Sequence, residues 1–207
     1  MTDQLRFEIH DALANIGYGW CTAAKAIPMA QSILDNRSQV CVEIGVYGGK
    51  SLIPCAMALR AQGSGHIIGI DPWTIEAATE GESDPANKAW WSKLEHIKGA
   101  ENCARDFIRH YQLESVCSVI PARSEHVAWL FQDGTVDFLH IDGNHTELAS
   151  VRDVNFWLPK MRSGGFIWFD DINWATCQKA LAILDERCVR AQEIIVDTIA
   201  CRCYRVK

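Results

Sequence analysis

The chain has 207 residues, of which 48% are hydrophobic and 22% charged, and its formal net charge is −6. This length and composition are typical of one globular domain with a full core. The basic residues are scattered and form no cationic block, which excludes an electrostatic surface for nucleic acids and favours small-molecule chemistry.

The polar N-terminus and the lack of a long apolar run predict a cytoplasmic protein that does not contact membranes. The nine cysteines are odd in number and irregularly spaced. In a reducing compartment we expect most of them to be small core residues rather than disulfide partners or metal ligands.

Apolar side chains recur at helical spacing through residues 1–37 and predict two helices on either side of Gly17-Tyr18-Gly19. Units that alternate strand and helix follow. The expected strands span residues 40–45, 66–71, 116–121, 136–142 and 165–170. The expected helices span residues 51–62, 86–111, 125–131 and 147–161. This order predicts a single α/β domain, 1–207, whose mostly parallel sheet carries helices on both faces.

The C-terminal part of the chain departs from this alternation. A helix over 177–188 is followed by two short strands, 192–196 and 199–206. Their connection is too short for a crossover, so the last strand must run antiparallel to the one before it.

The first strand runs into a glycine-rich turn, Gly45-Val46-Tyr47-Gly48-Gly49-Lys50-Ser51, and a helix follows it. Glycines let the backbone approach a ligand closely, and the helix N-terminus presents free N–H groups. Glu43, just ahead of the turn, repels phosphate but favours a cation or a ribose hydroxyl. The turn therefore predicts a site for a nucleoside that carries positive charge.

Acidic residues also follow the other central strands, where open parallel sheets bind their ligands. Asp71 comes 26 positions after Gly45, about where an acid meets ribose hydroxyls in dinucleotide-binding folds. Asp142, Asp170 and Asp171 end the fourth and fifth strands. Their oxygens suit Mg²⁺, which would relieve their mutual repulsion. Alternatively, Asp171 caps the next helix and Asp142 braces a turn.

Two histidines accompany these acids. His145 follows Asp142 by three residues and either acts as a general base or begins a helix without a catalytic role. His140 lies within a strand and is expected to be buried and hydrogen-bonded. The segment 74–99, with Trp90-Trp91, is either a lid over the ligand site or an amphipathic helix packed on the sheet.

Together these motifs resemble class I S-adenosylmethionine-dependent methyltransferases over nearly the whole chain. The turn after Glu43 resembles the family's first motif, and Gly69-Ile70-Asp71-Pro72-Trp73 its second. The segments 141–145 and 164–171 are most similar to the small metal-dependent O-methyltransferases of the macrocin and catechol type. The resemblance implies a Rossmann-like, doubly wound seven-stranded sheet in the order 3-2-1-4-5-7-6, with strand 7 antiparallel.

The resemblance also implies the site residues. Asp142, Asp170 and Asp171 would hold Mg²⁺, with His145 standing where the catechol type has its lysine base. Asp142 and His145 would be catalytic, and adenine would lie near Ser124. The expected contacts of S-adenosylmethionine are Glu43, Gly45, Tyr47, Gly48, Gly49, Ser51, Asp71, Trp73, Ser124 and Asp142.

The expected function is methylation of a hydroxyl group on a small molecule, with Mg²⁺ assistance. The acceptor class stays open, and the N-terminal helices could form a homodimer. Three alternatives also stay open: a catalytically silent S-adenosylmethionine-binding module, an NAD-dependent oxidoreductase and an ATP-binding enzyme. The last is disfavoured because three residues, not four, separate Gly45 from the Gly-Lys pair.

Overall fold

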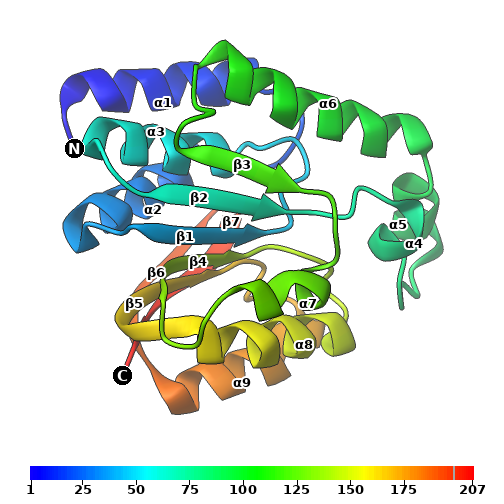
Figure 1. Cartoon of the computed structure of the whole chain (residues 1–207). Coiled ribbons are helices and arrows are strands. Elements are labelled where there is room, and N and C mark those ends of the chain that lie inside the picture. Colours follow the sequence, from blue (N-terminus) through cyan, green and yellow to red (C-terminus); the bar gives the residue numbers. More distant parts are fainter. Residues whose placement is uncertain (198) are drawn as a thin grey trace.

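The computed structural model describes residues 1–197 and 199–207 and contains a seven-stranded sheet in the order β3-β2-β1-β4-β5-β7-β6 (Figure 1). The strands are β1 (Val40–Ile44), β2 (His66–Ile70), β3 (Cys117–Ile120), β4 (Val136–Ile141), β5 (Met161–Phe169), β6 (Cys188–Val196) and β7 (Ile199–Val206). β7 runs antiparallel to both of its neighbours, and the pairs from β3 to β5 are parallel. The predicted strand order and the antiparallel last strand are confirmed.

Helices cover both faces of the sheet (Figure 1). One face packs against α1 (Asp3–Asn15), α2 (Ala23–Asn36), α3 (Leu52–Gln62) and α6 (Leu94–His110). The other packs against α7 (Ser124–Val127), α8 (Glu147–Trp157) and α9 (Gln178–Arg187). Two short helices, α4 (Ile75–Ala78) and α5 (Pro85–Trp91), lie beyond the ends toward which β1, β2 and β3 point (Figure 1).

The core has two halves because successive side chains of a strand point to opposite faces. Cys41 and Phe138 join the cluster under α1, α2, α3 and α6, whereas Val42 and Leu139 join the cluster under α7, α8 and α9. All nine cysteines are free and eight are buried, as expected for small core residues.

Several element boundaries differ from the sequence prediction. β5, expected over 165–170, begins at Met161, and β6, expected over 192–196, begins at Cys188. The helix expected over 125–131 is α7, which ends at Val127 and is followed by a 3₁₀ turn over Ala128–Leu130.

The helix expected over 86–111 is two helices, because Lys93 takes an extended conformation between α5 and α6. The helix expected to reach residue 161 ends at Trp157. Pro159, which has no N–H to donate, lies in a short 3₁₀ turn there, and β5 begins directly afterwards at Met161.

Candidate active site

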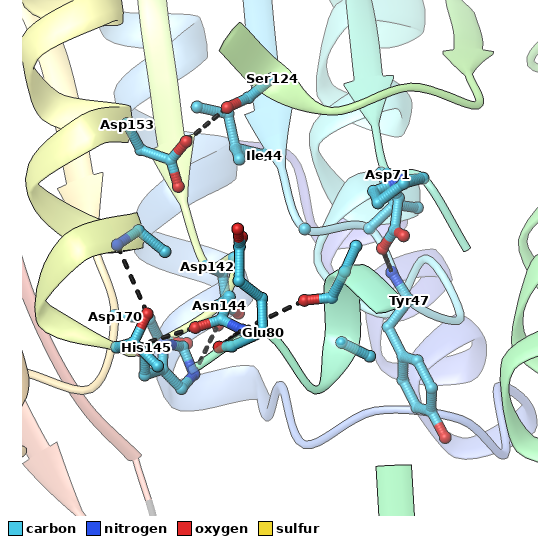
Figure 2. Close-up of a pocket in the computed structure, with 18 of the residues that line it drawn as sticks. Ile44, Tyr47, Asp71, Glu80, Ser124, Asp142, Asn144, His145, Asp153 and Asp170 are labelled. Carbon is cyan, nitrogen blue, oxygen red and sulfur yellow. Dashed lines mark hydrogen bonds and ion pairs between the residues drawn. The ribbon is translucent and has the colours of Figure 1, made fainter. Parts of the chain in front are cut away.

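A cavity of about 740 Å³ opens at the carboxyl ends of β1, β2, β4 and β5 (Figure 2). It lies where β1 meets β4, the point at which the strand order reverses and at which open α/β sheets bind ligands. Gly45 allows the two strand ends to approach. Its φ is +82°, and a Cβ on it would lie 1.9 Å from the backbone oxygen of Asp142. Any other residue here would push the two strand ends apart.

Asp71 connects two turns beside the cavity. Its carboxylate accepts hydrogen bonds from the backbone N–H of Tyr47 at 2.9 Å and of Trp73 at 2.8 Å. Both donors have positive φ, which bulky residues rarely adopt, and the Trp73 indole also donates to the Tyr47 carbonyl. Burial raises the pKa of Asp71, although these backbone bonds oppose the rise. The carboxylate keeps further lone pairs that can accept a hydrogen bond from a hydroxyl group.

Glu43, predicted to face the cofactor, lies behind the cavity wall. Its side chain is fully buried, accepts a hydrogen bond from the Ser51 hydroxyl at 2.9 Å and pairs with Nδ1 of His140 at 3.0 Å. Gly48 and Gly49 also lie behind the wall. The other predicted cofactor residues line the cavity: Gly45, Tyr47, Ser51, Asp71, Trp73, Ser124 and Asp142.

The three predicted metal ligands share the cavity rim, but each is already paired with a basic side chain. Nζ of Lys25 lies 3.0 Å from Oδ2 of Asp142 and also bonds to Asp170. Nε2 of His145 lies 2.6 Å from Oδ2 of Asp171. Among the described residues, two sets of side chains here bring possible metal-ligand atoms close together: His140, Asp142 and Asp170 form one, and Asp142, His145 and Asp171 form the other. Because an ammonium group bridges two of the acids, this arrangement does not fit a bound Mg²⁺.

The protonation states follow from this pairing. Burial disfavours the charge of Lys25, but Asp142 and Asp170 outweigh it and raise the pKa of the amine well above its usual value. Burial also disfavours the Asp142 carboxylate, yet Lys25 and His140 lower its pKa. At His145 burial also disfavours the charged form, but the hydrogen bond with Asp171 prevails and raises the pKa.

A further carboxyl group, that of Asp153 on α8, lies on another side of the cavity (Figure 2). It accepts a hydrogen bond from the hydroxyl of Ser124, the residue that the family resemblance places near adenine. Burial raises the pKa of Asp153 to about 7, although Ser124 and Arg152 act in the opposite direction. At neutral pH this side chain therefore exists partly as the uncharged acid.

The segment 74–99 runs along the cavity mouth. Glu80 in this segment bonds to Arg123 at 2.7 Å and to Arg152 at 3.0 Å, which ties the segment to α7 and α8. Trp91 lines the cavity and packs edge-on against Tyr47. Trp20, from the loop before α2, stacks on Tyr47 with ring centroids 5.6 Å apart. The tryptophan pair thus packs at the cavity mouth, and closure of the segment as a lid stays a prediction.

Sequence reasoning missed Lys25 and Asp153. Lys25 is the only charged residue between Ala23 and Leu34, a pattern that marks a buried, paired charge. Asp153 lies on the buried stripe of α8 with Ala149 and Trp157, so its spacing placed a carboxyl on an apolar face. Both signals were present in the sequence, but neither names the partner of the charge.

Residues 42–172 match a family described as a methyltransferase domain. The match spans more than half of the chain, so the chain belongs to this methyltransferase family, and its sheet order is that of the class I fold. No curated protein matches the chain in sequence. Among the described residues, we find no helix with the length and apolar character needed to span a membrane.

Three solved structures show the similarity in fold. The O-methyltransferase TomG from Streptomyces achromogenes, in complex with S-adenosylmethionine, aligns with 100% of this chain and 91% of its own at a TM-score of 0.66 and 14% identity. An O-methyltransferase from Bacillus cereus in complex with S-adenosylhomocysteine covers 100% and 92%, with a TM-score of 0.64 and 15% identity. The methyltransferase PaMTH1 from Podospora anserina covers 100% and 89%, with a TM-score of 0.65 and 15% identity.

Proposed function

We propose that this protein is an S-adenosylmethionine-dependent O-methyltransferase that acts on a hydroxyl group of a small molecule. The observation that carries the proposal is one cavity that reaches both Asp71 and the His145–Asp171 pair. The first is suited to ribose hydroxyls and the second to removing a proton. The complexes of the similar TomG and Bacillus cereus enzymes with S-adenosylmethionine and S-adenosylhomocysteine support the cofactor assignment.

The cavity fits such a cofactor. Its volume of about 740 Å³ lies within the range of sites for small molecules, and its lining combines apolar surface with many polar and charged side chains. Asp71 is held by two backbone bonds and can still accept from a vicinal diol. When bound, S-adenosylmethionine supplies an electrophilic methyl group on a sulfonium ion.

His145 is the proposed general base. Its Nε2 is bound to Asp171, which leaves Nδ1 to take the proton of an acceptor hydroxyl. Asp171 orients the ring and stabilises the imidazolium that forms, and the Trp174 ring packs edge-on 5.0 Å from the imidazole. The acceptor oxygen bonds to the methyl carbon as that carbon's bond to sulfur breaks. Magnesium assistance, predicted from the sequence, does not enter this scheme, because Lys25 already bridges Asp142 and Asp170. A homodimer and a cytoplasmic location stay predictions.

Isothermal calorimetry with S-adenosylmethionine and S-adenosylhomocysteine tests the proposal. We expect wild type to bind both, and Asp71→Ala to bind about tenfold or more weakly, since a hydrogen bond to a charged group contributes roughly 1.5–3 kcal/mol. Asp106→Ala, a change at an exposed carboxylate of α6, is the matched control and should bind like wild type. Thermal melting of each variant checks that it is folded. If wild type bound neither molecule, the proposal would be wrong.

Transfer itself is measured next, with radiolabelled S-adenosylmethionine and a panel of phenols, catechols and sugars. We expect His145→Ala to lose most of the turnover on any accepted substrate while retaining cofactor binding. A His145→Ala variant with wild-type turnover would exclude His145 as the base.

A further inference from the structure

Lys25 occupies an unusual place for a lysine. It is the third residue of α2, and its side chain is only 1% exposed. The first turn of a helix carries the positive end of the helix dipole, so an ammonium group there is unfavourable in itself. Burial adds a second penalty, because a charge removed from water needs charged or hydrogen-bonding partners. Because both the helix dipole and burial disfavour the charge of Lys25, we expect strong contacts of its ammonium group to compensate.

Those contacts are with the two strand-end carboxylates. Nζ of Lys25 lies 3.0 Å from Asp142, which follows β4, and also bonds to Asp170, which follows β5. The backbone fixes both acids, because Asp142 N donates to the Ile44 carbonyl at 2.9 Å and Asp170 N to the Ile141 carbonyl at 3.0 Å. The ammonium group thus comes from a helix distant in sequence and is aimed at two rigidly held carboxylates.

A divalent cation on these carboxylates would have to compete with the ammonium group. Lys25 lies behind the acids, does not line the cavity and has almost no exposed surface. If an ion displaced it, the ammonium group would stay buried without its two partners. The remaining acid, Asp171, is engaged by His145 at 2.6 Å.

We propose that the Lys25 ammonium group stands in place of a divalent cation between Asp142 and Asp170, so that methyl transfer here is independent of metal. The metal independence of methyl transfer rests on the proposed function, whereas the pairing of Lys25 with the two acids does not. Lys25 acts through the two carboxylates, which line the cavity, and is a positioning residue. The acceptor proton passes to His145, the methyl group passes from sulfur to oxygen, and neither step needs an ion.

The inference is tested by measuring Mn²⁺ binding to the chelator-treated protein. Binding is monitored as a decrease in the electron paramagnetic resonance signal of free Mn²⁺. We expect wild type to leave this signal unchanged. Lys25→Met keeps the side-chain length but frees two carboxylates, and should gain about one Mn²⁺ per chain. Lys179→Met, a change of an exposed lysine on α9, is the control and should behave like wild type.

Stoichiometric Mn²⁺ binding by wild type that disappears in Asp170→Asn would overturn the inference. A folded Lys25→Met protein that binds no Mn²⁺ would also overturn it, because the ammonium group would then not stand in an ion's place. If Lys25→Met does not fold, the wild-type and Asp170→Asn titrations decide alone. None of these measurements uses S-adenosylmethionine, so their failure is distinct from failure of the proposed function.

Once an acceptor substrate is identified, its methylation provides a second test. We expect turnover to be unchanged by EDTA and by added Mg²⁺. A loss of activity in EDTA that Mg²⁺ restores would contradict metal independence.

Discussion

Asp153→Asn should change how the stability of the protein depends on pH. Burial raises the pKa of the folded Asp153 carboxyl from its ordinary value of 3.8 to about 7. Between these two values the folded state holds a proton that the unfolded state has lost. The folded state therefore loses stability as pH rises through this window, and the loss is complete above about 7.

The size of the effect follows from the same two values. Each pKa unit corresponds to about 1.36 kcal/mol, so the gap between 3.8 and about 7 is worth at most about 4 kcal/mol. Asparagine has nearly the same shape, does not titrate and can still accept the hydrogen bond from Ser124. The Asp153→Asn protein should thus gain stability relative to wild type as pH rises, by roughly 3 kcal/mol between about pH 5 and pH 8.

Urea denaturation of both proteins across this pH range measures the difference, in which the other titrating groups cancel. Asp106→Asn, on the exposed surface of α6, is the control and should run parallel to wild type. Stability curves for Asp153→Asn and wild type that stay parallel within about 0.5 kcal/mol would refute the assigned burial and pKa.

Three further changes probe the turn and the proposed base. Gly45→Ala should cost roughly 3 kcal/mol or more in urea denaturation, because its Cβ would overlap the backbone of Asp142, directly after β4. Gly63→Ala, with similar φ but open space, should cost only about 1–2 kcal/mol, and equal costs would contradict the steric argument. Asp171→Asn should shift the acidic limb of kcat/KM to lower pH by removing the partner that raises the pKa of His145, and an unmoved limb would count against His145 as base. Ser51→Ala should cost about 1–3 kcal/mol in thermal or urea unfolding, since a buried carboxylate loses its donor; a cost near zero would be inconsistent with that bond.

The strand order shows how far local patterns reach. Alternating apolar runs located five of the strands to within a few residues, and the short final connection required β7 to be antiparallel. The full order came from the family resemblance, since periodicity does not determine which strands pair. The break between α5 and α6 was missed, because no glycine or proline lies between Trp91 and Leu94 to mark it.

The site was predicted in part for the same reason. Carboxyl ends of parallel strands meet at one edge of the sheet. The sequence could therefore predict that Asp71, Asp142 and Asp170, which follow strands, lie close together there. The direction in which each side chain points could not be predicted in this way. Glu43 is one residue before the end of β1, and that step turns it away from the cavity toward His140.

The sequence by itself determined the fold class, the ligand edge of the sheet and the set of acids that converge there, because these follow from periodicity and from chain direction. Only the tertiary structure decided what neutralises those acids. Lys25 is 117 residues from Asp142 and 145 from Asp170 along the chain, and it meets them because α2 packs against the sheet beneath their strand ends. A charge partner of this kind depends on packing between distant elements, which no local spacing encodes.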